Sequence, residues 1–354
     1  MSERRAPGVA VALVAGAVAA AATSCTPRWE KANPVRPIPD SPIGIDSRLS
    51  ELDRPPTPQR VRLGRWLFYD KRLSVDGSVS CATCHQPEHA FSEPTPTSTG
   101  IHGLKGTRKA PSLVNLAFAL SPQLFWDGRA DSLEAQALMP ITNPVEMGNQ
   151  PEGMLRSLEA VSGYRPYFRE AFGTEEITAE RATQAIADYE RTRLSGGSPW
   201  DRWRRRREPD AVSALVKAGD ELFFGKAACG QCHLGDTLSD GRFHNVGVGW
   251  DAATGKFADQ GRFRVTGRPE DLGAFRTPGL REVARHAPYM HDGSVATLEG
   301  VVELYDRGGT PNPHLSPKVH RLHLSADEKR ALVALLRALD GEGYQDEPPS
   351  AFPQ

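Results

Sequence analysis

The chain has 354 residues, of which 39% are hydrophobic and 25% are charged. This length is sufficient for two domains with separate hydrophobic cores. Because 43 Lys and Arg balance 44 Asp and Glu, for a formal net charge of −1, the composition gives no indication of a nucleic-acid partner.

Residues 1–25 have the pattern of an export signal rather than of a folded segment. Two arginines precede an apolar run of small residues over 9–22, which is typical of a cleaved leader and short for a membrane-spanning helix. Cys25 follows in a degenerate version of the bacterial lipoprotein cleavage site. Two interpretations stay open: lipidation of Cys25, which we favour and which would anchor the protein to a membrane, and ordinary cleavage after Ala22.

Residues 26–57 are rich in proline and in polar side chains. This composition favours a tether, or a strap over the surface, rather than a packed core.

Two C-x-x-C-H motifs contain four of the five cysteines. Each motif is typical of a covalently attached c-type haem, in which the thiols form thioethers and the histidine binds the iron. No cysteine remains to complete a tetrahedral zinc site, so two haem c groups are expected. Because such haems are attached outside the cytoplasm, the motifs also predict a periplasmic location. The expected haem-binding residues are Cys81, Cys84, His85, Cys229, Cys232 and His233.

Similar short amphipathic segments precede the two motifs, Leu63–Phe68 before the first and Ala218–Phe223 before the second. Each could pack an apolar face on a haem, so the chain has the pattern of a duplication.

Helix signals dominate the remainder. A helix is expected from about Ile177 to Arg193, and Ser325 with Glu328 forms a capping box. Convincing period-two alternation is absent. We therefore expect a mainly α fold of two cytochrome-c-like helical haem domains, 58–200 and 201–345, joined by long loops and followed by a tail over 346–354.

Several phrases of the sequence resemble the bacterial di-haem cytochrome c peroxidase and MauG superfamily, over about residues 62–339. The resemblance implies that the N-terminal haem meets hydrogen peroxide and that the C-terminal haem stores or passes electrons. The phrases are Arg62–Gly64, Lys109–Asn115, Phe125–Arg129, Pro144–Met147 and Pro288–Gly293.

Three residues of the first half match positions of the family's reaction centre. Trp126 matches a tryptophan between the two haems, which can pass electrons because its ring can be transiently oxidised. Gln136 and Glu146 match the distal pocket of the peroxide-binding haem. Cleavage of the O–O bond needs a base that moves a proton from one oxygen to the other, and Glu146 suits this role, with Gln136 positioning the oxidant.

His102 lies in a glycine-flanked segment and matches the histidine that caps the peroxide-binding haem in fully oxidised peroxidases. The resemblance implies a resting-state iron ligand that leaves when the other haem gains an electron. An exposed loop histidine is the alternative.

The residue at the second haem's sixth position distinguishes the branches of the family. The peroxidases have a methionine fourteen residues after the histidine of Pro288–Gly293, whereas this chain has Tyr305 there, as the MauG and MbnH-type enzymes do. A phenolate favours oxidised iron and a thioether favours ferrous iron. Two alternatives stay open: Tyr305 as a core residue of an apolar helix face, and Met290 as the ligand.

The chain departs from the family at two positions. The family has an asparagine that helps to hold Ca²⁺ between the haems where this chain has Lys109, and an ammonium group is not a calcium ligand. Backbone carbonyls near His286 and Pro288 could still contribute, so calcium is left open. The MauG relay tryptophan is replaced by Ala227, so electrons from a large protein donor must enter elsewhere.

We therefore expect a periplasmic di-haem oxidoreductase of the MauG and MbnH branch. It would reduce hydrogen peroxide and, through a high-valent di-haem state, oxidise a protein electron donor, with a tryptophan side chain on that partner as one candidate target. The alternatives are a cytochrome c peroxidase that draws electrons from a small cytochrome, and an electron carrier without catalysis.

Overall fold

The computed structural model describes residues 26–354. The predicted leader and the candidate lipidation site Cys25 lie outside the described residues. No helix in the described part of the chain is long and apolar enough to cross a membrane.

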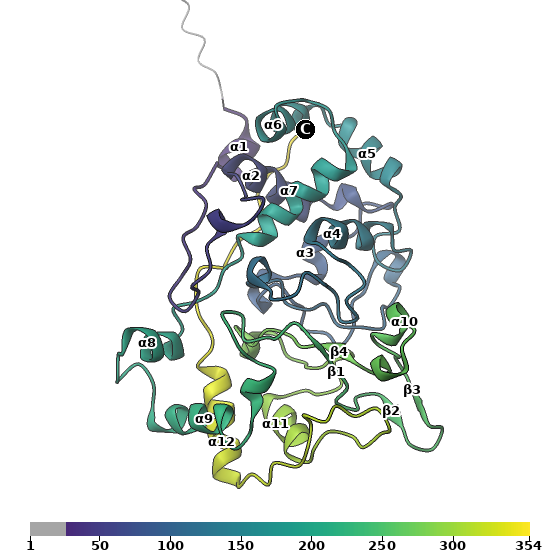
Figure 1. Ribbon diagram of the computed structural model, residues 1–354. Helices are drawn as coiled ribbons and strands as arrows, with labels where there is room; N and C mark the ends of the chain where they lie inside the picture. Colours follow the sequence, from purple (N-terminus) through teal and green to yellow (C-terminus); the bar gives the residue numbers. More distant parts are fainter. Residues whose placement is uncertain (1–25) are drawn as a thin grey trace, which may run out of the picture.

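The structure is mainly helical, as predicted, with two small antiparallel pairs of strands, β1 with β4 and β2 with β3. Figure 1 shows α2–α7 gathered in the upper part of the molecule and α8, α9, α11 and α12 in the lower part. We call these the N-terminal and C-terminal helical units. The elements are α1 (Arg28–Ala32), α2 (Pro58–Tyr69), α3 (Cys81–Cys84), α4 (Leu133–Thr142), α5 (Pro151–Glu159), α6 (Arg165–Phe172), α7 (Ala179–Arg191), α8 (Pro199–Arg206), α9 (Ala214–Phe224), β1 (Phe243–His244), β2 (Trp250–Asp251), β3 (Lys256–Phe257), α10 (Phe263–Thr266), β4 (Phe275–Arg276), α11 (Leu298–Asp306) and α12 (Ala326–Arg337).

Local sequence signals explain where the main helices begin. Thr178 caps α7 by accepting a hydrogen bond from the Arg181 amide at 3.3 Å. The helix therefore begins at Ala179, two residues after the predicted start at Ile177. At α12 the predicted capping box is confirmed: Ser325 Oγ accepts from the Glu328 amide at 3.2 Å, and Glu328 Oε2 accepts from the Ser325 amide at 2.7 Å.

The same helix crossing occurs in both units. In the N-terminal unit α2 packs on α7, and in the C-terminal unit α9 packs on α12. A Cβ atom at Gly64 would lie 1.8 Å from the Ala185 carbonyl oxygen, and one at Gly219 would lie 2.1 Å from the Ala331 carbonyl oxygen. Each helix before a haem motif therefore needs glycine at its crossing, as expected of a duplication.

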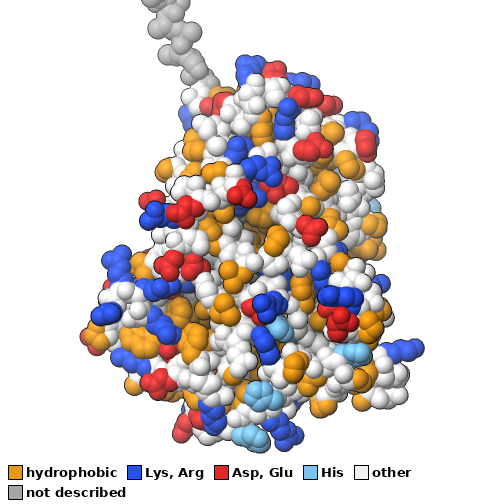
Figure 2. Space-filling view, in the orientation of Figure 1, with side chains coloured by type: hydrophobic (Ala, Val, Ile, Leu, Met, Phe, Trp, Pro, Cys, Tyr) orange, Lys and Arg blue, Asp and Glu red, His pale blue; other side chains and the backbone are white. Residues whose placement is uncertain are grey.

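Each unit has its own hydrophobic core. The N-terminal core contains Trp66, Phe68 and Tyr189, and the C-terminal core contains Phe223 and Leu335. On the face shown in Figure 2, acidic and basic side chains are interspersed over both units.

Both ends of the described chain bind the two units together. The segment before α2 reaches the C-terminal unit, where Asp236 Oδ2 accepts hydrogen bonds from the amides of Asp46 and Ser47 at 2.9 and 3.0 Å. The segment after α12 returns to the N-terminal unit, and the C-terminus lies near α6 (Figure 1). There the Gly163 amide donates to the Gln354 carbonyl at 2.8 Å.

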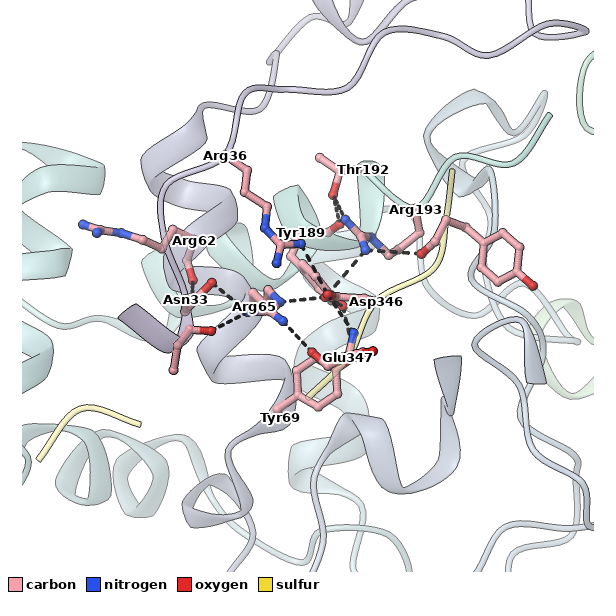
Figure 3. Close-up of polar contacts among 12 residues, drawn as sticks. Asn33, Arg36, Arg62, Arg65, Tyr69, Tyr189, Thr192, Arg193, Asp346 and Glu347 are labelled. Carbon is pink, nitrogen blue, oxygen red and sulfur yellow. Dashed lines mark hydrogen bonds and ion pairs between the residues drawn. The ribbon is translucent and has the colours of Figure 1, made fainter. Parts of the chain in front are cut away.

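Asp346 anchors this returning segment (Figure 3). Its carboxylate, 1% exposed, accepts hydrogen bonds from Arg65 Nε at 2.7 Å and from the Tyr189 hydroxyl at 2.8 Å. Arg36 and Arg193 each approach it to 3.6 Å. Burial opposes ionisation of Asp346, but Arg65 and Arg193 outweigh it and lower its pKa.

An Asp346→Asn variant should lose about 3–5 kcal/mol of stability, because it leaves buried guanidinium groups without their counter-charge. The contribution of Asp346 is present above the carboxyl's ordinary pKa near 3.8 and is lost as the pH falls through its lower folded value. Denaturant unfolding of the holo-protein at pH 7 measures this loss. Glu270→Gln is the matched control, since Glu270 is 67% exposed in its pair with Arg268 and should cost less than about 1 kcal/mol.

Candidate functional site

The first haem motif forms a single helical turn, α3, with His85 at its end. Ser80 and Thr83 form a capping box at the start of this turn. His85 Nδ1 lies 2.8 Å from the Phe91 carbonyl oxygen, and Phe91 has a left-handed φ of 55°. If Nδ1–H donates to this carbonyl, Nε2 is left free for a metal ion, as is usual for metal-binding histidines.

The second motif repeats this arrangement in the C-terminal unit. His233 Nδ1 lies 2.9 Å from the Leu238 carbonyl oxygen, and Leu238 also has a left-handed φ, 54°. Each histidine is therefore oriented by a carbonyl from a residue a few positions after it.

Both motifs line one continuous cavity. Its empty volume, with the open mouth included, is about 3330 Å³, and residues of both helical units line it. The four cysteines of the two motifs are free thiols and also line it. The volume, the free thiols and the oriented histidines fit two large covalently attached groups.

Trp126 is held at the junction of the two units. Its indole Nε1 donates to the Lys109 carbonyl at 2.9 Å, and its own carbonyl accepts from the Arg276 amide, in β4, at 2.8 Å. Arg108 reinforces the junction by pairing with Asp127 of the N-terminal unit and Asp259 of the C-terminal unit, both at 2.6 Å. The indole is thus held by the N-terminal unit and the Trp126 backbone by the C-terminal unit.

Gln136 and Glu146 line the same cavity near the first motif. Gln136 lies on α4, and Glu146 lies in the turn that follows α4. Glu146 Oε1 accepts a hydrogen bond from Asn143 Nδ2 at 2.7 Å. Burial raises the pKa of Glu146, against the opposing charge of Arg129. A carboxylate with a raised pKa is suited to accept a proton and return it near neutral pH.

Tyr305 and Met290, the two candidate ligands of the second haem, both line the cavity. Tyr305 lies on α11, which Thr297 caps by accepting a hydrogen bond from the Gly300 amide at 3.1 Å. Burial raises the pKa of the Tyr305 phenol, and the neighbouring thiols of Cys229 and Cys232 act in the same direction. The phenol therefore lies beside the second cysteine pair. The half-buried side chain of Tyr305 faces the cavity.

His102 is not brought to this cluster. Its side chain is 65% exposed, and Nδ1 lies 3.6 Å from Asp76 Oδ2. Among the described residues that line the cavity, the same loop contributes Ser98, Gly100 and Gly106 but not His102. Binding of His102 to iron would need a movement of this loop.

Sequence reasoning missed Glu190, near the end of α7. It is 3% exposed, lines the cavity, and has one carboxyl oxygen without a partner in the described part of the chain. Burial raises the pKa of Glu190 to about 8. The sequence did contain a signal for Glu190. It follows Ala182 and Ile186 at intervals of four residues, which places a carboxyl group on the apolar face of a helix.

Comparison with known proteins agrees with this geometry. A family model described as di-haem cytochrome c peroxidase matches residues 58–209. The methylamine utilization protein MauG of Methylorubrum extorquens is 45% identical over 291 residues, 81% of this chain and 80% of that protein. The cytochrome c551 peroxidase of Nitrosomonas europaea is 35% identical over 288 residues, 81% and 82% of the two chains. The crystal structure of a MauG-like protein associated with microbial copper homeostasis is similar with a TM-score of 0.77 and 33% identity, covering 90% of this chain and 97% of that one.

These relatives divide between MauG proteins and cytochrome c peroxidases. The family and the two cysteine pairs imply two c-type haems, with hydrogen peroxide as substrate and a cytochrome or another protein as electron donor. The chain belongs to the di-haem cytochrome c peroxidase and MauG family of oxidoreductases.

Proposed function

We propose that this enzyme works in the periplasm, reduces hydrogen peroxide at the His85 site, and retains both oxidising equivalents until a protein donor discharges them. A tryptophan side chain of a partner protein is a suitable donor for such an oxidant. The observation that supports this role most is the Tyr305 phenol, which lines the cavity beside the second cysteine pair. A phenolate ligand would favour oxidised iron at that site.

The residues around the first motif would carry the proton chemistry. A haem held by His85 supplies the redox-active iron to which peroxide binds. Glu146 would take the proton from one peroxide oxygen and return it to the other, while Gln136 hydrogen-bonds the oxidant. With two electrons and two further protons, one peroxide becomes two water molecules. The hydrogen bond from Asn143 to Glu146 would hold the base in place.

Trp126 would connect the two sites. Its ring lines the cavity and its backbone and indole nitrogen are held by residues of both units. An oxidisable ring in a fixed position is suited to pass electrons from the second haem to the first.

A Trp126→Phe variant should attach both haems and consume peroxide at the first site, yet oxidise the second haem far more slowly. Loss of the hydrogen bond to the buried Lys109 carbonyl should cost about 1–3 kcal/mol of stability, so the fold should persist. Stopped-flow absorption at the two haems after mixing with peroxide measures the transfer. Trp203→Phe, in α8, is the matched control. Wild-type transfer in Trp126→Phe would exclude the relay role.

One equivalent of peroxide added to the fully ferric holo-protein, without reductant, tests the proposed function. We expect direct reaction, with loss of the ferric EPR signals and a new near-infrared band. A ferric protein that ignores peroxide until one electron is supplied would contradict the proposal.

The second candidate is a cytochrome c peroxidase that draws electrons from a small cytochrome. Met290 favours this candidate, because its thioether lines the same cavity as Tyr305 and a methionine is the second haem's ligand in the peroxidases. One relative of comparable coverage is named as such a peroxidase. Rapid steady-state oxidation of reduced small cytochrome c by peroxide would favour this candidate, since an enzyme that stores its oxidising equivalents for another protein should turn over poorly with that donor.

A further inference from the structure

A buried lysine lies at the junction between the two haem motifs. Lys109 is 4% exposed and lines the cavity that both motifs share. Its ammonium group donates a hydrogen bond to the Glu93 carbonyl oxygen and lies 3.5 Å from the Thr95 carbonyl oxygen. Burial lowers the pKa of Lys109 to about 8, against the opposing charge of Glu93, so the group carries its proton at neutral pH.

The charge of this ammonium group is not cancelled by a direct ion pair. Within the described residues, the hydrogen-bond partners of the Lys109 ammonium group are the carbonyl oxygens of Glu93 and Thr95 rather than carboxylates. The nearest carboxylate that acts on it, Glu93, is itself occupied by hydrogen bonds from Ser98 Oγ at 2.5 Å and the Ala110 amide at 2.8 Å. The Lys109 charge also acts on His286 of the C-terminal unit. Burial lowers the pKa of His286 to about 4, and the repulsion from Lys109 acts in the same direction.

The backbone of Lys109 ties this charge to both units. Its carbonyl accepts the Trp126 indole N–H at 2.9 Å, and its amide donates to the His291 carbonyl at 2.8 Å. The preceding residue, Arg108, pairs with carboxylates of both units. A positive charge is thus built into the point at which the two units and Trp126 meet.

The surroundings of Lys109 do not fit a calcium ion. Calcium needs six to eight oxygen ligands at 2.3–2.6 Å, whereas here an ammonium group already takes the carbonyl oxygens of Glu93 and Thr95. A divalent cation would also be repelled by the like charge. Lys109 therefore supplies no ligand to the calcium ion that family resemblance implies at this position, and its ammonium group contacts two carbonyl oxygens there.

We propose that the Lys109 ammonium takes the place of calcium as the positive charge between the haems at neutral pH and raises the reduction potentials of both without any exchangeable ion. A nearby positive charge stabilises the more reduced form of a redox centre and raises its potential. The haem potentials of this protein should consequently be independent of calcium. This inference does not depend on how the oxidising equivalents of peroxide are used.

The first test uses the wild-type holo-protein. Spectroelectrochemical titration of both haems should give the same potentials with calcium chloride and with a chelator, and isothermal titration with calcium chloride should show no binding. Calcium-dependent potentials, or stoichiometric calcium binding, would overturn the proposal. This arm does not depend on the folding of any variant.

The second test removes or moves the charge. Lys109→Met should lower the potentials of both haems, and added calcium should not restore them. Lys109→Arg keeps the charge and should stay close to wild type. Lys109→Asn removes the charge and adds an oxygen ligand, so its potentials should be low in chelator and rise with calcium.

The control for the second test is Lys105→Met. Lys105 lies on the same loop but is exposed, with Nζ 2.7 Å from Thr99 Oγ1, and its loss should leave both potentials unchanged. Haem absorption and circular dichroism establish that each variant is folded before its potentials are compared. Wild-type potentials in a folded Lys109→Met protein would contradict the proposal, because removing the charge would then have no effect on either haem.

Discussion

Replacing Tyr305 with phenylalanine should prevent the enzyme from retaining both oxidising equivalents of peroxide. The substitution keeps the aromatic ring that α11 presents to the cavity and removes only the hydroxyl. In the cavity, burial raises the pKa of the Tyr305 phenol, so a phenolate there requires a bound metal ion to stabilise it. Without the phenol, the second haem loses the ligand that favours oxidised iron.

Two measurements follow from this expectation. After one equivalent of peroxide, the Tyr305→Phe protein should lack the near-infrared band expected of the wild type. The second haem's potential should also rise, since axial ligands move haem potentials over a range of about 0.8 V. Met290→Leu is the matched control and should leave both properties close to wild type. If Met290→Leu shifts the potential and Tyr305→Phe does not, Met290 is the ligand and the Tyr305 assignment is wrong.

Replacing Glu146 with glutamine should slow peroxide reduction by about 10²–10⁴-fold, the usual contribution of a positioned general base. Glutamine has nearly the same shape and can still accept the hydrogen bond from Asn143, but it cannot take a proton. Stopped-flow consumption of peroxide by the holo-protein measures the effect. Glu152→Gln, an exposed carboxyl nearby on α5, should have no effect. Retained turnover in Glu146→Gln would exclude this residue as the base.

The pH profile gives an independent check on Glu146. Because the base must be deprotonated, peroxide reduction should rise with pH through the raised pKa of this carboxyl, above its ordinary value near 4.5. Glu146→Gln should lose this acidic limb and react slowly at all pH values. An unchanged limb in the variant would assign the titration to another group, with Glu190 the next candidate because it is buried in the same cavity.

Much of the fold was predictable because its signals are local in sequence. The capping box at Ser325 involves residues three positions apart and forms as expected, and the helix expected from about Ile177 begins at Ala179. The repeated segments before the motifs indicated a duplication, and Gly64 and Gly219 supply its physical basis at the two helix crossings. The mainly helical fold and the family follow from the same local patterns.

The candidate site was predictable only in part. The motifs and family phrases identified residues that line one cavity, including Trp126, Glu146 and Tyr305, although their roles stay predictions. Sequence spacing could not show that His102 is exposed beside Asp76, nor that Glu190 faces the cavity with an unpartnered oxygen. Both depend on how a loop or a helix end is turned relative to distant segments.

The sequence by itself determined two haem-attachment motifs, a mainly helical duplicated chain and the family, because these depend on covalent chemistry and on contacts within a few residues. Only the tertiary structure decided that Asp346 joins Arg65 in the N-terminal unit and that Lys109 is buried in the cavity that both motifs line. The physical reason is that a buried charge is stable only where partners from distant segments surround it, and no local pattern records which segments those are.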